Sequence, residues 1–115
     1  MSYNKYRDCI EACNTCAAVC SHCATACLQE EDINMLSRCI QLDLDCADIC
    51  HLAAKLMARG SEFSERICFI CAEICEACGE ECKKHKNMDH CQECAEACFD
   101  CAKICREMIS IETSS

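Results

Sequence analysis

Apolar positions in this chain recur at alternating spacings of three and four residues, which is the period of the buried seam of a helix in a bundle. The first such stretch reads CIEACNTCAAVCSHCATAC and runs from Cys9 to Cys27. Each seam position, where a bundle normally carries Leu or Ile, holds a cysteine. On a helix this stretch is about 27 Å long. The pattern predicts a helix with a row of sulfur atoms along its buried side.

The same period predicts four helices, at approximately residues 2–28, 33–58, 62–84 and 90–110. Short polar links separate them, and Asp32 is the predicted N-cap of the second helix. Gly60 followed by Ser61 is typical of one helix ending and the next beginning. Asp89 and Gln92 have the spacing of a capping box at the start of the fourth helix.

Cysteines occupy every seam position of the third and fourth helices as well. They are Cys68, Cys71, Cys75, Cys78 and Cys82 in the third helix, and Cys91, Cys94, Cys98, Cys101 and Cys105 in the fourth.

The second helix has fewer cysteines and more Leu and Ile. Its seam holds Cys39, Cys46 and Cys50, and Asp43 stands at the vacant seam position. Two orientations are open: Asp43 points inward as a carboxylate ligand, or the helix is rotated so that Leu42 faces in. Because apolar residues occur on more than one face, this helix is expected to be buried or to contact another subunit.

Short links between helices make neighbours antiparallel, so we predict an all-α, up-down-up-down four-helix bundle. A length of 115 residues is that of one domain, covering residues 1–115. The chain has no Pro and only two Gly, so little interrupts long helices. All four rows of cysteines then point at one axis and line the interior with thiols.

Charge and hydropathy exclude several functions. The net charge of −9 argues against nucleic acid, which is bound through Lys and Arg. No apolar run approaches the roughly 18 residues of a membrane helix. The beginning of the chain, MSYNKYRDCIEAC, has no basic segment followed by an apolar one, so no secretory signal is expected. We therefore predict a cytoplasmic protein that contacts neither nucleic acid nor membrane.

The number and spacing of the cysteines argue against disulfides and against thiol catalysis. Nineteen is an odd count, and neighbours on one helix face have Cβ atoms roughly 5–6 Å apart, too far for an unstrained bridge. A redox CxxC needs a thiol of lowered pKa at a helix N-terminus near positive charge. The pairs here lie in mid-helix in an acidic protein. With no nucleophile–base pair and no phosphate loop in view, we predict that the chain is not an enzyme.

Rows of thiolates favour soft metal ions: Cu(I), zinc or iron–sulfur clusters. Zinc needs four converging ligands, and iron–sulfur clusters need specific cysteine spacings, whereas these rows are uniform. Thiolates crowded in one lumen repel one another strongly, and one monovalent ion per thiolate neutralises them. Cu(I) is therefore the predicted guest, with many ions per chain. A metallothionein-like Zn or Cd buffer is the alternative.

The motif CxxxCxxCxxxCxxCxxxC in the first helix, with CxxCxxxCxxCxxxC in the third and fourth, resembles the bacterial copper storage proteins, and the missing signal resembles their cytosolic branch. The resemblance covers residues 6 to 108. It implies Cu(I) held inside the bundle at about one ion per cysteine, a homotetramer, and entry at an open end lined by His and Met. A copper chaperone is a candidate partner.

Bundle topology separates two ends. One end has Cys9, Cys68 and Cys105 with apolar residues beyond them, and is expected to be plugged by Tyr6, Met57, Phe63 and Met108. The other end has Cys27, Cys39, Cys82 and Cys91, and is the predicted mouth, with Met35, His85, Met88 and His90 nearby. The predicted ligands are thus all nineteen cysteines, with Met35, Asp43, His85, Met88 and His90 added. His85 and His90 have a second interpretation as loop residues that only aid solubility.

Overall fold

The computed structural model describes residues 2–114, and the side chains of residues 6–109. Its helices are α1 (Ser2–Leu28), α2 (Ser37–Ala58), α3 (Ser64–Lys83) and α4 (Asp89–Ser114), with a 3₁₀ turn, η1 (Ile33–Leu36), before α2. The described residues contain no strand. None of the described helices has the length and apolar character needed to cross a membrane.

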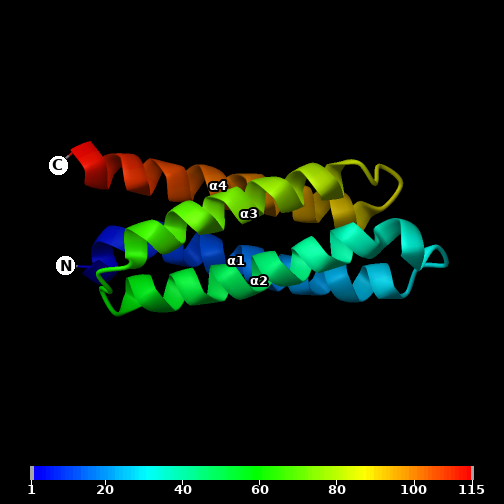
Figure 1. Ribbon diagram of the computed structural model, residues 1–115, viewed down its shortest axis with the longest axis horizontal. Coiled ribbons are helices and arrows are strands. Elements are labelled where there is room, and N and C mark those ends of the chain that lie inside the picture. The colour runs from blue at the N-terminus through cyan, green and yellow to red at the C-terminus, as the bar shows by residue number, and fades with distance from the viewer. Residues whose placement is uncertain (1, 115) are drawn as a thin grey trace.

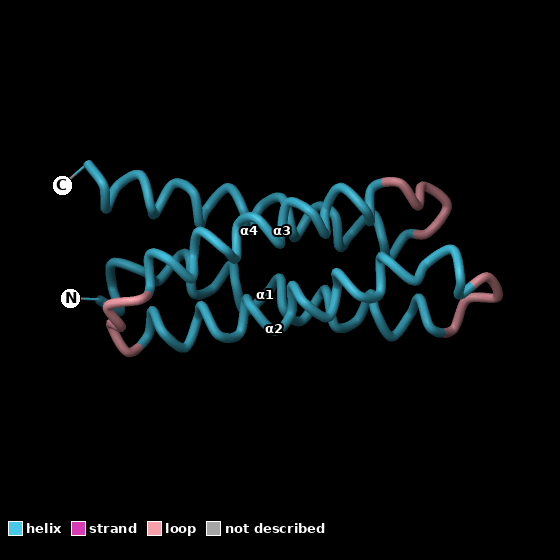
Figure 2. The backbone as a smooth tube through the Cα atoms, in the orientation of Figure 1, coloured by secondary structure: helices cyan, strands magenta, loops and turns pink. Residues whose placement is uncertain are grey.

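The four helices form one elongated antiparallel bundle, as predicted (Figure 1). They run along its long axis, and the links lie at alternate ends (Figure 2). The principal extents are 49 × 21 × 17 Å. Each helix packs against its two neighbours in chain order, and α4 closes the ring against α1. The closed arrangement surrounds a single axis with one face of every helix.

The second helix begins later than predicted. Residues 33–36 form the 3₁₀ turn, and α2 starts at Ser37. The predicted N-cap role of Asp32 is wrong: its side chain makes no capping hydrogen bond, and only its carbonyl accepts the Met35 N–H, at 3.3 Å. Leu36 is completely buried. The 3₁₀ turn therefore brings the Leu36 side chain into the core. Burial of this side chain, and not a side-chain cap at Asp32, determines how the segment begins.

The link between α2 and α3 behaves largely as predicted. Gly60 has φ of 66°, the left-handed conformation that favours glycine at a helix end. The Ser61 hydroxyl accepts the Phe63 N–H at 3.1 Å, and the Ser64 hydroxyl donates to the Ser61 carbonyl at 2.8 Å. These contacts form a turn ahead of the helix, so α3 starts at Ser64, two residues after the predicted position.

The predicted capping box of the last helix is wrong. The Gln92 side chain donates to the His85 carbonyl at 2.9 Å, so it satisfies a backbone acceptor just after α3 rather than the start of α4. Asp89 is itself the first residue of α4, and the helix continues to Ser114, past the predicted residue 110. Spacing along the chain could not show this because the acceptor belongs to the preceding link.

Candidate metal centre

All nineteen cysteines lie among the described residues, all are buried, and none forms a disulfide. Each one points to the bundle interior, as the three-and-four spacing predicts. Thiols thus replace the Leu and Ile of an ordinary bundle along the axis. Larger buried side chains occur toward the ends, namely Tyr6, Leu36, Met57 and Met108.

Sulfur atoms from different helices touch along this axis. Cys16 of α1 has its Sγ 3.7 Å from that of Cys46 in α2 and 3.9 Å from that of Cys98 in α4. Cys46 lies 3.4 Å from Cys75 of α3, and Cys9 lies 3.4 Å from Cys105 at one end. These separations are far longer than the S–S bond of about 2.05 Å and suit sulfur atoms that share a metal ion.

The sulfur atoms form overlapping groups of four in which all atoms lie within 4.8 Å of one another. Several thiols belong to more than one group, as these sets show: Cys16, Cys46, Cys50, Cys75; Cys16, Cys20, Cys46, Cys98; Cys20, Cys78, Cys94, Cys98; and Cys13, Cys71, Cys101, Cys105. Because neighbouring groups share ligands, the column is suited to ions that accept bridging sulfur. Isolated tetrahedral ions cannot fill all groups at once.

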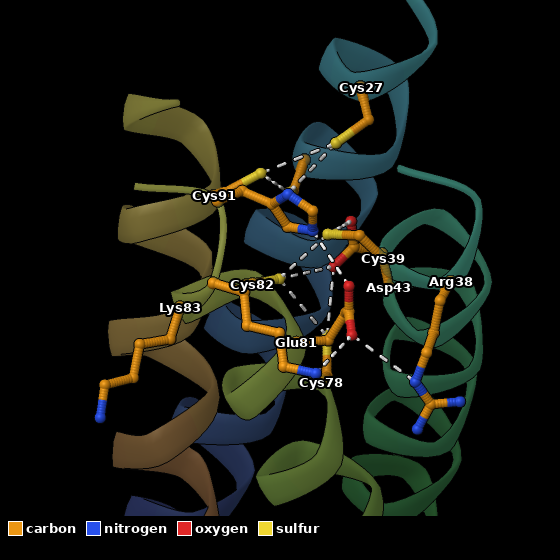
Figure 3. A network of polar contacts seen from close by, with 12 residues as sticks. Cys27, Arg38, Cys39, Asp43, Cys78, Glu81, Cys82, Lys83 and Cys91 are labelled. Carbon is orange, nitrogen blue, oxygen red and sulfur yellow. Dashed lines mark hydrogen bonds and ion pairs between the residues drawn. The ribbon is translucent and has the colours of Figure 1, made fainter. Parts of the chain in front are cut away.

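Asp43 joins this column from α2. It is completely buried, and its Oδ1 lies 3.2 Å from the Sγ of Cys78, 3.3 Å from that of Cys94 and 3.5 Å from that of Cys82. Figure 3 shows the carboxyl between the thiols of α2 and α3. Leu42 is only partly buried, so of the two predicted orientations the structure has the inward Asp43. Burial, and then the neighbouring thiols, raise the pKa of Asp43 to about 10.

His90 faces the thiols at the predicted mouth. Its Nδ1 lies 3.6 Å from the Sγ of Cys91, 3.7 Å from that of Cys23 and 3.8 Å from that of Cys27. Its other nitrogen, Nε2, lies 3.0 Å from Oε2 of Glu30. In the neutral ring Nε2–H donates to the carboxylate, which leaves the lone pair of Nδ1 directed at the three sulfur atoms.

His85 is held by a carboxylate in the same way. Its Nε2 lies 3.0 Å from Oε2 of Glu81, whose side chain is only 9% exposed. Glu81 also lies 3.4 Å from Lys84 and 3.6 Å from Arg38, and Figure 3 shows the contact to Arg38. The structure therefore supplies the two mouth histidines with carboxylate partners.

The methionines occupy different surroundings. Met88 is partly buried and packs against the core, whereas Met35 is 68% exposed and lies outside the thiol column. At the opposite end the thiol of Cys68 donates to Sδ of Met57 at 3.5 Å. Met108 is buried there as well. Of the two methionines predicted at the mouth, the structure thus brings only Met88 against the core.

Sequence reasoning missed Glu30 and Glu81, the partners of the histidines. Glu81 stands four residues before His85 at the end of α3, and this spacing was a usable signal. Glu30 lies in a link sixty residues from its histidine, and no local pattern connects the two. Met57 was predicted to fill the core, and its contact with a thiol was not foreseen.

Hydrogen bonding among the thiols of the metal-free chain raises the pKa of some and lowers the pKa of others, such as Cys16. Burial raises the pKa of Cys27 to about 11, and hydrogen bonding to Cys16 and other neighbours, together with burial, raises the pKa of Cys98. A thiolate, not a thiol, binds metal, so metal binding must release protons. The arrangement can therefore exchange protons for soft metal ions along its whole length.

A protein-family model described as copper storage protein matches residues 2–110. A cysteine-rich protein of Bacillus subtilis strain 168, YhjQ, whose function is uncharacterized, is 58% identical over 87 residues, which is 76% of this chain and 80% of the relative. The structure of Cu(I)-bound copper storage protein BsCsp3 is 55% identical, with a TM-score of 0.88 over 91% of this chain and 98% of that one. A cytosolic copper storage protein from Streptomyces lividans, described as loaded with five coppers, is 38% identical, with a TM-score of 0.90 over 95% of each chain.

Proposed function

The chain belongs to the copper storage protein family, and from this membership we propose that it stores many Cu(I) ions on the thiolates along its axis. The observation that carries the proposal is the continuous column of buried, unbridged thiols contributed by all four helices. Two relatives of the same fold are described as holding copper. The stored amount is proposed to be about one ion per cysteine, with all nineteen cysteines as ligands.

The physical argument for Cu(I) rests on softness and on charge. Thiolate is a soft ligand that favours Cu(I), and overlapping groups of sulfur let neighbouring ions share ligands. Each Cu(I) that replaces a thiol proton leaves the charge of the lumen unchanged. A divalent ion at the same ratio would add one positive charge per site in a low-dielectric interior. A monovalent ion can therefore fill the column completely.

Storage in this form needs only exchange of protons for metal, so the proposal includes no catalytic reaction. The cytoplasm is the proposed location, since the Streptomyces relative is described as cytosolic. A copper chaperone is a candidate donor of the ions.

Entry is proposed at the end that carries His90, His85 and Met88. The Nδ1 of His90 already faces three thiols, and an imidazole there can receive an ion and pass it inward by ligand exchange. His85 and Met88 are proposed as auxiliary ligands. Because Met35 is exposed to solvent, it is proposed only as a first contact for an ion outside the bundle. Asp43 is proposed to position the neighbouring thiols and to contact an ion bound by them. Its place is midway between this mouth and the deeper groups.

The proposed capacity is tested by titrating the fully reduced, metal-free protein with Cu(I) under anaerobic conditions, in competition with a Cu(I) chelator. Uptake of close to one ion per cysteine with unchanged helicity is expected, because the column is already formed. A parallel titration with Zn²⁺ and Cd²⁺ tests the metallothionein-like alternative. Saturation at a few Cu(I) ions, with divalent ions bound as well or better, would contradict the storage function.

The proposed entry is tested by the rate of Cu(I) uptake from a chelated donor. His90→Ala is expected to slow uptake about tenfold or more while leaving the final copper content unchanged. His85→Ala is expected to have a smaller effect in the same direction. His22→Ala is the matched control, because His22 is exposed on the outer surface of α1. Equal rates of Cu(I) uptake for His90→Ala and the control would contradict the proposed entry route.

A further inference from the structure

The four donor atoms at the mouth form an almost regular tetrahedron. The Sγ of Cys23 lies 3.9 Å from that of Cys27 and 3.9 Å from that of Cys91, and Cys27 lies 3.8 Å from Cys91. Nδ1 of His90 caps this triangle of sulfur atoms at 3.6, 3.7 and 3.8 Å. We propose that Cys23, Cys27, Cys91 and His90 form a site for a single divalent transition-metal ion of the Zn²⁺ kind, in addition to the proposed Cu(I) store.

The dimensions of the tetrahedron match those of a zinc site. An ion with bonds of about 2.3 Å to sulfur and about 2.05 Å to nitrogen, in tetrahedral geometry, requires S···S distances of about 3.8 Å and N···S distances of about 3.5 Å. The six distances in the structure are within a few tenths of an ångström of these values. The ligands are therefore preorganised for a divalent ion and need almost no movement to bind it.

The ligand chemistry separates this group from the deeper ones. Three thiolates and one imidazole are an established zinc ligand set, and together with Zn²⁺ they carry a net charge of −1. A group of four thiolates around the same ion carries −2. The deeper groups, such as Cys16, Cys46, Cys50 and Cys75, are completely buried, so this extra charge would be costly there. At the mouth the His90 side chain is 15% exposed, and an ion can reach it from solvent.

Two features of the fold support the ligands. Glu30 holds Nε2 of His90, which fixes the ring with Nδ1 toward the sulfur atoms, and such carboxylate partners are common behind zinc-binding histidines. His90 and Cys91 lie in the first turn of α4, where the positive end of the helix dipole stabilises a thiolate. Glu30 thus acts as a positioning residue for this site.

Binding of one divalent ion has a defined balance: three S–H bonds break, three metal–sulfur bonds and one metal–nitrogen bond form, and three protons leave to solvent. No electron is transferred. If the proposed Cu(I) entry also holds, an ion bound at these four ligands blocks that route until it is displaced. Protein preloaded with Zn²⁺ is therefore expected to take up Cu(I) more slowly and to reach the same final copper content.

The test uses Co²⁺ as a spectroscopic probe, followed by Zn²⁺. Reduced, metal-free protein titrated with Co²⁺ is expected to show the intense visible bands of tetrahedral cobalt, to saturate at one ion per chain, and to lose the bands when Zn²⁺ is added. His90→Ala is expected to weaken binding at least tenfold and to shift the bands. His22→Ala, on the exposed outer surface of α1, is the matched control and is expected to leave both unchanged. Uptake of several equivalents at equal affinity, absence of tetrahedral bands, or unaltered binding by His90→Ala would each overturn the site.

The role of Glu30 is tested through the ring nitrogens of His90. In ¹⁵N NMR spectra the metal-free protein is expected to show His90 with its proton on Nε2. Glu30→Leu is expected to remove this preference and weaken Co²⁺ binding, whereas Glu30→Gln, whose amide oxygen still accepts a hydrogen bond, is expected to restore much of both. Glu31→Leu, on an exposed neighbour, is the control. An unchanged tautomer in Glu30→Leu would show that Glu30 does not position the ring.

Failure of this site is distinguishable from failure of copper storage. The same preparation is titrated with Cu(I) alone: full copper capacity without a cobalt site rejects only the divalent site. A cobalt site without copper capacity rejects only the store.

Discussion

At the scale of single residues, Asp43 is the position where an ionisable oxygen group replaces a thiol in the column. The helical period predicts an inward residue at 43, and the structure buries it completely among Cys78, Cys82 and Cys94. A buried carboxylate without a cationic partner is costly. The group therefore keeps its proton at neutral pH, in agreement with the pKa raised to about 10.

This raised pKa predicts how stability depends on pH. Between the ordinary value of 3.8 and about 10, the folded chain keeps a proton that the unfolded chain has released, so the free energy of unfolding falls as the pH rises through this range. Asp43→Asn removes the effect. The advantage of the variant over the wild type is expected to grow by up to about 3 kcal/mol between pH 5 and pH 7.

Thermal or urea unfolding of the reduced, metal-free proteins at the two pH values measures this difference. All other ionisable groups are present in both proteins, so their contributions cancel in the comparison. Asp48→Asn, an exposed aspartate on the same helix, is the control and is expected to show no growing advantage. Parallel pH dependence of wild type and Asp43→Asn would contradict the buried, protonated carboxyl.

At the scale of elements, α3 and α4 pack closely because Gly79 has no side chain. A Cβ atom at this position would lie 2.9 Å from the Phe99 ring. Farther along the same pair of helices, Arg106 forms two hydrogen bonds to Glu76, at 2.7 and 2.8 Å, and lies over the Phe69 ring at 5.3 Å. Aromatic rings thus pack outside the sulfur column and hold this pair together.

The close approach predicts that the effect of Gly79→Ala on the free energy of unfolding changes sign when the Phe99 ring is removed. Alanine favours a helix over glycine by about 1 kcal/mol, but overpacking against a ring costs about 1–3 kcal/mol. We expect a net loss of about 1 kcal/mol in the wild type and a gain of about 1 kcal/mol in a Phe99→Ala background. Urea unfolding of the four proteins in a double-mutant cycle measures the coupling. A coupling energy near zero would show that the ring yields freely to the new methyl group.

At the scale of the whole molecule, the surface is unevenly divided between charge and apolar groups. A groove of about 530 Å³ between α1 and α4 has five carboxylates among its lining residues, namely Asp8, Glu11, Glu93, Glu96 and Asp100. On α2, α3 and the link between them, Leu52, Phe63 and Ile70 are 42%, 49% and 42% exposed. Because a chain with net charge −9 is expected to repel its copies through the acidic groove, the apolar residues of α2 and α3 are the better candidate contact surface.

We therefore expect the homotetramer that the family resemblance implies to use this face. Asp45 and Arg59 each stand seven residues from Leu52, one before it and one after it. If α2 of a second copy packs antiparallel across Leu52, Asp45 of one copy lies opposite Arg59 of the other. Leu52→Glu combined with Ile70→Glu is expected to lower the mass measured by light scattering while Cu(I) capacity per chain is retained. Leu28→Glu, an apolar residue 52% exposed at the end of α1, is the control. An unchanged mass for the double variant would exclude this face as the interface.

The sequence by itself determined the helices, their antiparallel order and the inward side of each, because a strict three-and-four spacing allows only one face of a helix to be buried. It also determined the soft-ligand chemistry, since cysteine occupies every seam position of three helices. The period placed Asp43 at a seam position but left an inward Leu42 as an open alternative, and the buried Asp43 of the structure decided between them.

Tertiary structure decided what depends on atoms brought together from distant parts of the chain. The four donor atoms at the predicted mouth come from α1 and α4. Glu30 contacts His90 although the two are sixty residues apart in the chain. The Gln92 side chain donates to a carbonyl in the link that precedes its own helix. The starts of α2 and α3 also depended on burial of Leu36 and on the turn at Ser61. Periodicity specifies which side of a helix is buried, whereas bond lengths and partners depend on how far each helix is shifted and rotated against its neighbours, and only packing sets that.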